Sequence, residues 1–204
     1  MPAKNIVKQF ASNSYYHVYN RGVAKQKIFL DQSDKSYFLS LLDRHLNLHV
    51  VHKNKLGAPY KKFNDVELTC YCLMGNHYHF VFWQGDNSSD ITELMRSLGT
   101  SYTMYFNHKY KRVGPLFQGT YKASHILNES YLLHISRYIH LNPRYYENYH
   151  HSSLRAYTTG QSPPWLKPDK VLNQFEGEDY LEFVRDYEDR AQLLEEIKSE
   201  LANT

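Results

Sequence analysis

The sequence predicts an α+β fold in which an antiparallel, ferredoxin-like sheet has helices packed on one face and is followed by a C-terminal helical extension. Strand-like and helix-like hydrophobic patterns follow one another in the order strand, helix, two strands, helix, strand, helix. The two central strands are separated only by Met74-Gly75-Asn76, a spacing that is typical of a hairpin. The helix-like segments are amphipathic, so each needs an apolar surface to cover, and the sheet supplies one.

Four segments have the alternating pattern, or the aromatic and β-branched composition, of strands. A loop over residues 52–64, which contains Gly57, Pro59 and several lysines, separates the first helix from the hairpin. The expected strands span residues 15–21, 66–73, 77–84 and 120–127.

Three segments keep apolar residues at the helical period and begin at residues that can cap a helix. The third is expected to end near Leu141, because the residue before a proline avoids the helical conformation and Asn142-Pro143 follows. Beyond it, prolines indicate a tether over residues 158–170, and a charged helical tail is expected to pack back on the body. The candidate N-caps are Asp31 or Ser33 for the first helix, residues 88–90 for the second and Asn128 for the third.

The composition is that of a soluble protein, with 42% hydrophobic and 22% charged residues and a net charge of +3. No run of eighteen apolar residues exists, so no membrane span is expected. The only two cysteines, Cys70 and Cys72, exclude a disulfide scaffold and favour a reducing cytoplasm. Nineteen tyrosines and ten phenylalanines are interleaved with lysine and arginine. Such a mixture binds single-stranded nucleic acid, although tyrosines on a wet surface would give the same composition.

His77 and His79 form a candidate metal site at the start of the second strand of the hairpin. Side chains at i and i+2 lie on the same face of a strand, so the two imidazoles can bind one divalent ion together with a ligand from elsewhere. With twelve histidines in 204 residues, about one such pair is expected by chance. The position directly after a tight turn therefore carries more weight than the spacing.

The hairpin also permits a second metal hypothesis. Cys70, Cys72, His77 and His79 together could form a tetrahedral zinc site. Two arguments disfavour it: structural zinc sites usually separate their cysteines by two or more residues, and a free cysteine is more often a small buried hydrophobe.

The third helix carries candidate nucleophiles. Tyr131, His134 and Tyr138 fall at i, i+3 and i+7 and share one stripe, whereas Leu132, Ile135 and Ile139 share another that would lie on the sheet. A tyrosine oxygen can act as a covalent nucleophile, and a nearby histidine can ligate a metal. Periodicity does not choose between the two tyrosines, and an ordinary amphipathic helix with an aromatic edge would look the same.

Ordered blocks of sequence between about residues 15 and 145 resemble the REP-associated tyrosine transposases. These are relatives of the small insertion-sequence transposases within the HUH endonuclease superfamily. The resemblance covers the order of the blocks and their spacing. The blocks are Tyr16-His17-Val18, Asn20-Arg21-Gly22-Val23, Ile28-Phe29, residues 72–79, Gly114-Pro115-Leu116-Phe117-Gln118-Gly119, Tyr131-Leu132-Leu133 and residues 137–143.

The resemblance implies an HUH catalytic domain over residues 1–157, followed by the tether and helical tail over 158–204. It implies magnesium or manganese held by His77 and His79, and Tyr131 as the nucleophile. In related transposases the third ligand lies about one turn beyond the tyrosine on the same helix, which makes His134 the candidate here. Arg21, Lys122 and Arg137 are candidate phosphate contacts, with solvated surface charges as the alternative for each.

The resemblance further implies a metal-dependent endonuclease and strand transferase that acts on single-stranded DNA bearing a REP-like hairpin. Cleavage would pass through a covalent 5′-phosphotyrosine, from which a second 3′-hydroxyl can rejoin strands. The protein would be a monomer or homodimer without a membrane partner, located in the bacterial cytoplasm in association with the nucleoid. The alternative is a hairpin-binding protein derived from such an enzyme that no longer cuts DNA.

Overall fold

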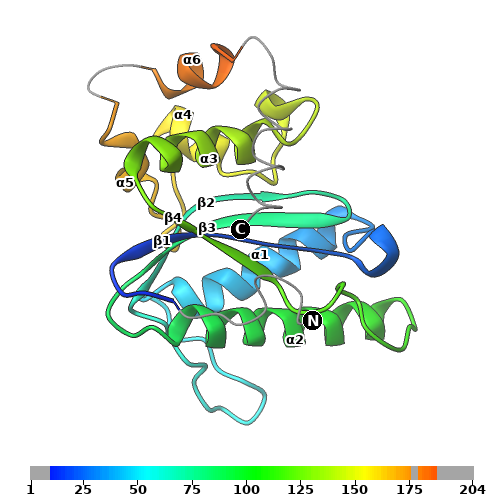
Figure 1. Ribbon diagram of the computed structural model, residues 1–204. Coiled ribbons are helices and arrows are strands. Elements are labelled where there is room, and N and C mark those ends of the chain that lie inside the picture. Colours follow the sequence, from blue (N-terminus) through cyan, green and yellow to red (C-terminus); the bar gives the residue numbers. More distant parts are fainter. Residues whose placement is uncertain (1–9, 176–178, 188–204) are drawn as a thin grey trace, which may run out of the picture.

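The computed structural model describes residues 10–175 and 179–187 and contains a four-stranded antiparallel sheet with helices on both faces (Figure 1). The sheet order is β2-β3-β1-β4, which is the ferredoxin-like arrangement. The predicted α+β fold class and the order of the elements are therefore confirmed. The strands are β1 (Ser14–Arg21), β2 (Val66–Leu73), β3 (His77–Gln84) and β4 (Lys122–Ile126). The helices are η1 (Val23–Lys25), α1 (Gln32–Leu46), α2 (Asp90–Lys109), α3 (Glu129–Leu141), η2 (Tyr146–Asn148), α4 (Leu154–Thr159), α5 (Asp169–Leu172) and α6 (Tyr180–Arg185).

Local capping sets the starts of two helices. Asp31 is the N-cap of α1, and it forms a capping box in which its side chain accepts from the Asp34 amide while the Asp34 carboxylate accepts from the Asp31 amide. Asn128 caps α3 by accepting a hydrogen bond from the Tyr131 amide at 2.8 Å. Both positions were among the predicted caps, and Ser33 instead lies inside α1.

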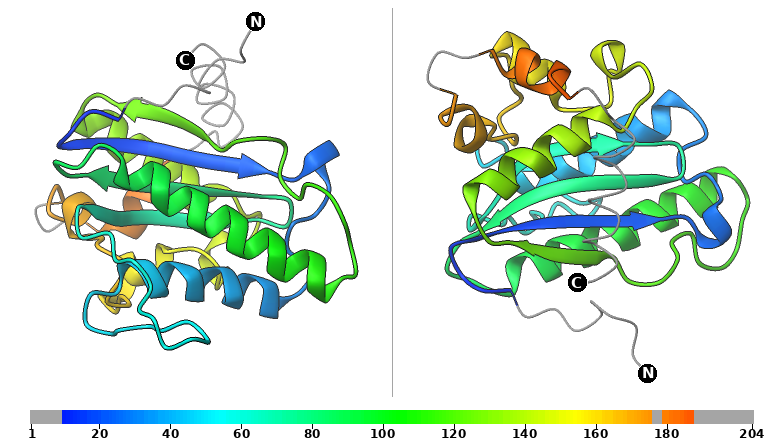
Figure 2. Two further views of the ribbon diagram at one scale, coloured as in Figure 1. Left: turned by 90° about the horizontal axis from the view of Figure 1, so that it is seen from below. Right: turned by 45° about the horizontal axis from the view of Figure 1, so that its top comes forward.

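The helices are distributed over both faces of the sheet, whereas the sequence led us to expect one (Figure 2). Helices α1 and α2 share a core with Val18, Phe80 and Phe82, while α3 and the shorter C-terminal helices share a second core with Cys70 and Val81. Both faces of the central strands are apolar, so both must be covered. Because α1 and α2 already fill the first face, α3 covers the second.

Residues 158–170 were expected to be a tether, but part of this segment packs on the edge strand β2. Trp165 and Leu166 are buried, and the Lys167 amide donates to the Leu68 carbonyl at 2.8 Å. Beyond this segment α6 packs on α3 and α4, as expected of the tail up to residue 187. The remaining expected tail positions, Leu194, Ile197 and Leu201, lie outside the described residues.

A buried polar cluster connects the second face to the C-terminal helices. The His140 side chain on α3 has no solvent exposure, and its two ring nitrogens lie 2.8 Å from the Tyr180 hydroxyl and 2.7 Å from Ser153 Oγ. Burial lowers the pKa of His140 to about 3, so the ring is neutral near pH 7. The cluster therefore ties α6 to α3 without placing a charge in the core.

Within the described residues, none of the helices combines the length and the apolarity that a membrane span requires.

Candidate functional site

A cavity of about 580 Å³ opens on the α3 face of the sheet, where β1 ends and β3 begins. Antiparallel register pairs Arg21 with His77 and Tyr19 with His79, so these four side chains share that face. Helix α3 contributes Tyr138 to the wall. The described residues that line the cavity are Tyr19, Asn20, Arg21, Lys25, Asn76, His77, His79, Gln118, Thr120, Lys122 and Tyr138.

The structure brings His77 and His79 side by side, with ring centroids 5.1 Å apart and planes at 84°. Burial lowers the pKa of both rings, and the neighbouring imidazoles lower that of His79 further, to well below its usual value. Both histidines are therefore neutral near pH 7, which is the protonation state that ligates metals. Their placement on one strand face agrees with the sequence-based prediction.

Each ring nitrogen of His77 faces an amide oxygen. Nδ1 lies 2.7 Å from Asn76 Oδ1, and Nε2 lies 3.2 Å from Asn142 Oδ1. The two amides are oriented by their own nitrogens, since Asn76 Nδ2 donates to the Lys25 carbonyl and Asn142 Nδ2 to the Tyr138 carbonyl. A neutral imidazole carries one N–H, so it can donate to only one of the two oxygens. With Nδ1 as donor, Nε2 and Asn142 Oδ1 are two acceptors facing each other, an arrangement that a cation bound by both would satisfy.

A third histidine, His17 on β1, contacts the His79 ring. His17 Nε2 lies 2.8 Å from His79 Nδ1, and the His17 side chain has no solvent exposure. Burial lowers the pKa of His17 to about 3. Its Nδ1 is buried and meets no hydrogen-bond partner among the described residues. When His79 Nδ1 donates to His17, His79 Nε2 is left with a free lone pair, as a metal ligand needs.

Tyr138, rather than Tyr131, lines the cavity. The Tyr138 ring stands edge-on to His79 at 5.4 Å between centroids and to His17 at 6.1 Å. Burial raises the pKa of Tyr19, and the Tyr138 phenol raises it further. Tyr131 lies two turns earlier on α3, about 10 Å along the helix axis, and packs against the second core.

Two other predicted site residues do not lie at the cavity. His134 is exposed on α3 and is not among the described lining residues. Arg137 is buried on the side of α3 that faces α6, where its guanidinium carbon lies 3.5 Å from the centre of the Phe183 ring. Arg137 is therefore a packing residue in this structure, because α3 turns that side toward α6.

The zinc hypothesis also finds no support in the described residues, which contain no group of three histidine, cysteine or acidic side chains placed to bind a metal. Cys70 Sγ lies near His140 Nε2 at 3.4 Å, and Cys72 Sγ near Met74 Sδ at 3.7 Å. Burial raises the pKa of both thiols, which opposes formation of the thiolates that zinc needs.

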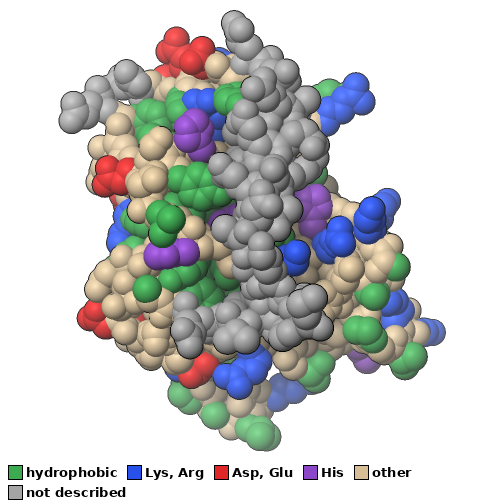
Figure 3. Space-filling view, viewed as in Figure 1, with side chains coloured by type: hydrophobic (Ala, Val, Ile, Leu, Met, Phe, Trp, Pro, Cys, Tyr) green, Lys and Arg blue, Asp and Glu red, His purple; other side chains and the backbone are tan. Residues whose placement is uncertain are grey.

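The rim of the cavity is cationic. Arg21, Lys25 and Lys122 line it, and none of the described lining residues is acidic. Arg21 Nε donates to Gln118 Oε1 at 2.5 Å, which fixes the guanidinium at the rim. Lys and Arg side chains gather on the side of the molecule where η1 lies (Figure 3). The cavity therefore places a phenol, neutral imidazoles and an amide oxygen beside three cations. This combination suits the binding of an anionic group next to the Tyr138 oxygen.

Sequence reasoning missed two site residues, His17 and Asn142. For Tyr138, periodicity left the choice open and the family resemblance favoured Tyr131 instead. A usable signal existed for Asn142. The residue four positions after Tyr131 is Ile135, which cannot ligate, whereas the residue four positions after Tyr138 is Asn142, which can. The sequence offered no comparable signal for His17.

Comparisons with known proteins identify a family and a similar fold. The family model described as "Transposase IS200 like" matches residues 10–142. A REP-associated tyrosine transposase solved bound to a REP hairpin has a similar fold, with a TM-score of 0.54, 12% identity, and coverage of 78% of this chain and 88% of that chain. A tRNA(His) guanylyltransferase from Saccharomyces cerevisiae also matches, at 12% identity over 97% of this chain and 82% of that chain, but its TM-score is only 0.38. None of the curated proteins compared with the chain matches it. The chain belongs to the IS200-like transposase family.

Proposed function

We propose that the chain is a metal-dependent nuclease and strand transferase that acts on single-stranded DNA next to a REP-like hairpin. The observation that carries this proposal is the gathering of Tyr138, His77 and His79 at one cavity with a cationic rim. Such a cavity suits phosphodiester chemistry through a tyrosine. Family membership and the hairpin-bound structural neighbour make DNA the expected substrate.

We propose Tyr138 as the nucleophile in place of Tyr131. Its support is positional: Tyr138 lines the cavity and its ring contacts His79, whereas Tyr131 packs against the core two turns away. A nucleophile must reach the phosphorus atom that the metal ligands help to place, so a tyrosine beside them is favoured over one about 10 Å further along the helix.

The proposed metal ligands are His77, His79 and Asn142, with Asn142 replacing His134. His77 Nε2 and Asn142 Oδ1 face each other at 3.2 Å, and His79 can present Nε2 because Nδ1 is engaged by His17. All three ligands are uncharged, so they leave the charge of the cation undiminished for a phosphate. A bound Mn²⁺ or Mg²⁺ would supply Lewis-acid polarisation of a non-bridging phosphate oxygen.

The protein groups account for the remaining chemistry. Arg21, Lys25 and Lys122 would bind the DNA backbone and orient the scissile phosphate. The Tyr138 oxygen attacks phosphorus in line, the bond from phosphorus to the 3′ oxygen breaks, and the phenolic proton is passed on to the departing 3′ oxygen. The product is a 5′-phosphotyrosine and a free 3′-hydroxyl. A second 3′-hydroxyl can reverse the step and join a new strand, because the covalent bond retains the energy of the phosphodiester.

His17 is proposed as a positioning residue for His79. Replacing His17 with phenylalanine keeps the ring volume but removes the acceptor at Nε2, so His79 would lose the contact that holds its tautomer and orientation. We expect the dissociation constant for Mn²⁺ to rise about 10- to 100-fold, as is typical when such outer contacts are lost. Isothermal titration of the protein with Mn²⁺, together with thermal melting in EDTA, measures the effect.

Glutamine at position 17 is the matched control, since its amide oxygen can take the place of the His17 Nε2 acceptor. We expect His17→Gln to retain most of the Mn²⁺ affinity that His17→Phe loses. Equal affinities for wild type, His17→Phe and His17→Gln would show that His17 does not position the ligand.

The proposed function is tested by incubating the protein with end-labelled single-stranded DNA that carries a REP-type hairpin. We expect Mn²⁺ or Mg²⁺ to produce a protein–DNA adduct that survives denaturation, and EDTA to abolish it. The alternative function, a protein that binds hairpins without cutting them, predicts DNA binding but no adduct under any metal condition.

A further inference from the structure

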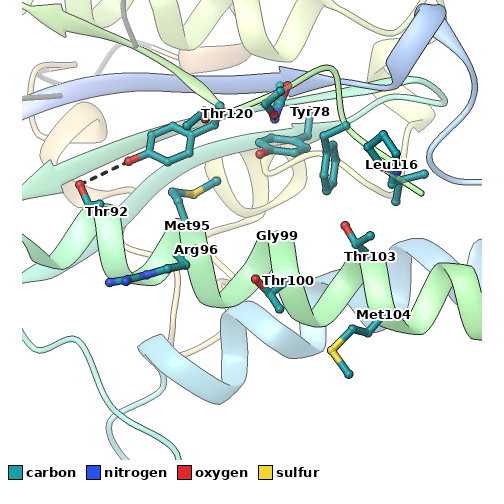
Figure 4. Close-up of a pocket in the computed structure, with 15 residues that line it drawn as sticks. Tyr78, Thr92, Met95, Arg96, Gly99, Thr100, Thr103, Met104, Leu116 and Thr120 are labelled. Carbon is teal, nitrogen blue, oxygen red and sulfur yellow. Dashed lines mark hydrogen bonds between the residues drawn. The ribbon is translucent and has the colours of Figure 1, made fainter. Parts of the chain in front are cut away.

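A second cavity, of about 720 Å³, lies on the opposite face of the sheet from the first, between α2 and the segment at residues 115–121. Asn20 and Tyr78, which are cross-strand partners, form part of its floor together with Leu116 and Phe117. Figure 4 shows Met95 and Thr103 of α2 pointing toward Tyr78 and Leu116 across this space. Its volume lies within the range of small-molecule sites. The mechanism proposed above makes no use of it.

A glycine inside α2, Gly99, lines this cavity (Figure 4). Met95, Gly99 and Thr103 are spaced four residues apart and lie on the face of α2 that lines the cavity (Figure 4). A Cβ added at Gly99 would meet no atom within 4 Å, so no steric contact requires glycine at this position. Glycine in a helix interior is less favourable than alanine. A side chain at position 99 would enter open space, so glycine here leaves room for a bound group.

The walls combine apolar side chains with hydrogen-bonding groups. Tyr78, Phe117 and Tyr121 supply aromatic rings, while Thr100, Thr103 and Arg96 supply hydroxyls and a guanidinium. Tyr121 is itself positioned by a hydrogen bond from its hydroxyl to Thr92 Oγ1 at 3.4 Å. Aromatic surface with a few polar groups at its edge is the environment in which unpaired bases bind.

The two cavities meet at the end of the sheet. Asn20 and Thr120 line both of them. The short segment between them is held in place, since Asn20 Nδ2 donates to the Gly119 carbonyl at 3.2 Å and the Gln118 amide to the Arg21 carbonyl at 2.8 Å. A DNA strand whose phosphate lies at the first cavity can therefore cross this edge and place a neighbouring base in the second.

We propose that the cavity between α2 and residues 115–121 is a subsite for an unpaired nucleobase of the strand being cut, close to the scissile phosphate. This inference rests on the proposed function, because it takes the first cavity to be the cleavage site. It adds a site that holds a base through aromatic contact and hydrogen bonds on the far face of the sheet from the metal ligands.

Filling the cavity tests the subsite without touching the cleavage residues. Gly99→Leu places a side chain in the open space and favours the helix, so the variant is expected to melt at or above the wild-type temperature. We expect its affinity for hairpin DNA with an unpaired flank to fall about tenfold or more. For the same DNA with abasic sites throughout the flank, we expect wild type and Gly99→Leu to bind equally. His108→Leu is the matched control, because His108 is exposed on the same helix and lines neither cavity.

Affinity is measured by fluorescence anisotropy in the presence of Ca²⁺ or EDTA, and adduct formation is measured in parallel with Mn²⁺. An adduct from wild type together with equal affinity of wild type and Gly99→Leu for the flanked DNA would overturn the subsite and leave the proposed function standing. A loss of affinity by Gly99→Leu that persists on the abasic DNA would also overturn it, since the base would not be the group that binds. Absence of an adduct from wild type would instead contradict the proposed function.

Discussion

Replacing Tyr138 with phenylalanine is expected to abolish the covalent protein–DNA adduct, lowering its rate of formation by at least about a thousandfold. The substitution removes only the phenolic oxygen. The phenylalanine ring can keep the edge-on contacts with His79 and His17, so the fold and the cationic rim should be unchanged. The measurement is the yield of labelled, denaturation-resistant adduct against time, with DNA affinity determined separately.

Tyr131→Phe is the matched control for this experiment. It removes the same atom from the same helix, two turns away and outside the described lining of the cavity. We expect wild-type rates of adduct formation from this variant. A wild-type rate from Tyr138→Phe combined with a loss in Tyr131→Phe would reverse the proposed assignment of the nucleophile.

Replacing Asn142 with alanine is expected to weaken Mn²⁺ binding by about a hundredfold or more, because one of three proposed ligands is lost. Asn142 Oδ1 faces His77 Nε2 at 3.2 Å, and the amide is oriented by its bond to the Tyr138 carbonyl. Carbonyl oxygens are ligands that suit magnesium and manganese, and the Asn142 amide supplies one. Isothermal titration calorimetry with Mn²⁺ gives the dissociation constants directly.

An aspartate at position 142 separates ligation from a general effect on the helix end. Its carboxylate places an oxygen where the Asn142 oxygen lies and adds a negative charge, so Asn142→Asp should bind Mn²⁺ at least as tightly as wild type. His134→Ala, on the exposed side of α3, should leave Mn²⁺ affinity unchanged. Unchanged affinity in Asn142→Ala, or a loss in His134→Ala, would show that the ligand set has been assigned wrongly.

The sheet and the helix boundaries were predictable because they depend on local patterns. The alternating strands, the three-residue hairpin turn and the capping residues Asp31 and Asn128 each determine structure within a few residues. The His77 and His79 pairing was predictable for the same reason, since a spacing of two residues on a strand places both on one face. The face of the sheet on which α3 lies was not predictable, because it depends on which surface α1 and α2 leave uncovered.

The position of the nucleophile along α3 depends on tertiary structure. Tyr131 and Tyr138 are seven residues apart, close to two full helical turns, so they point in nearly the same direction around the axis. Periodicity therefore cannot distinguish them. Only the way α3 crosses the sheet determines that its C-terminal half, with Tyr138 and then Asn142, lies over the histidines. His17 could not be predicted either, because its contact with His79 comes from the pairing of β1 with β3, across 62 positions in sequence.

The most direct test of the central claim is to identify the tyrosine that carries the DNA. The adduct formed with Mn²⁺ is trimmed with nuclease, digested with trypsin and sequenced by tandem mass spectrometry. Cleavage after Lys122, Arg137 and Arg144 separates the candidates, since Tyr131 falls in the peptide of residues 123–137 and Tyr138 begins the peptide of residues 138–144. We predict a phosphonucleotide on Tyr138. A phosphonucleotide on Tyr131, or on any other residue, would contradict the account.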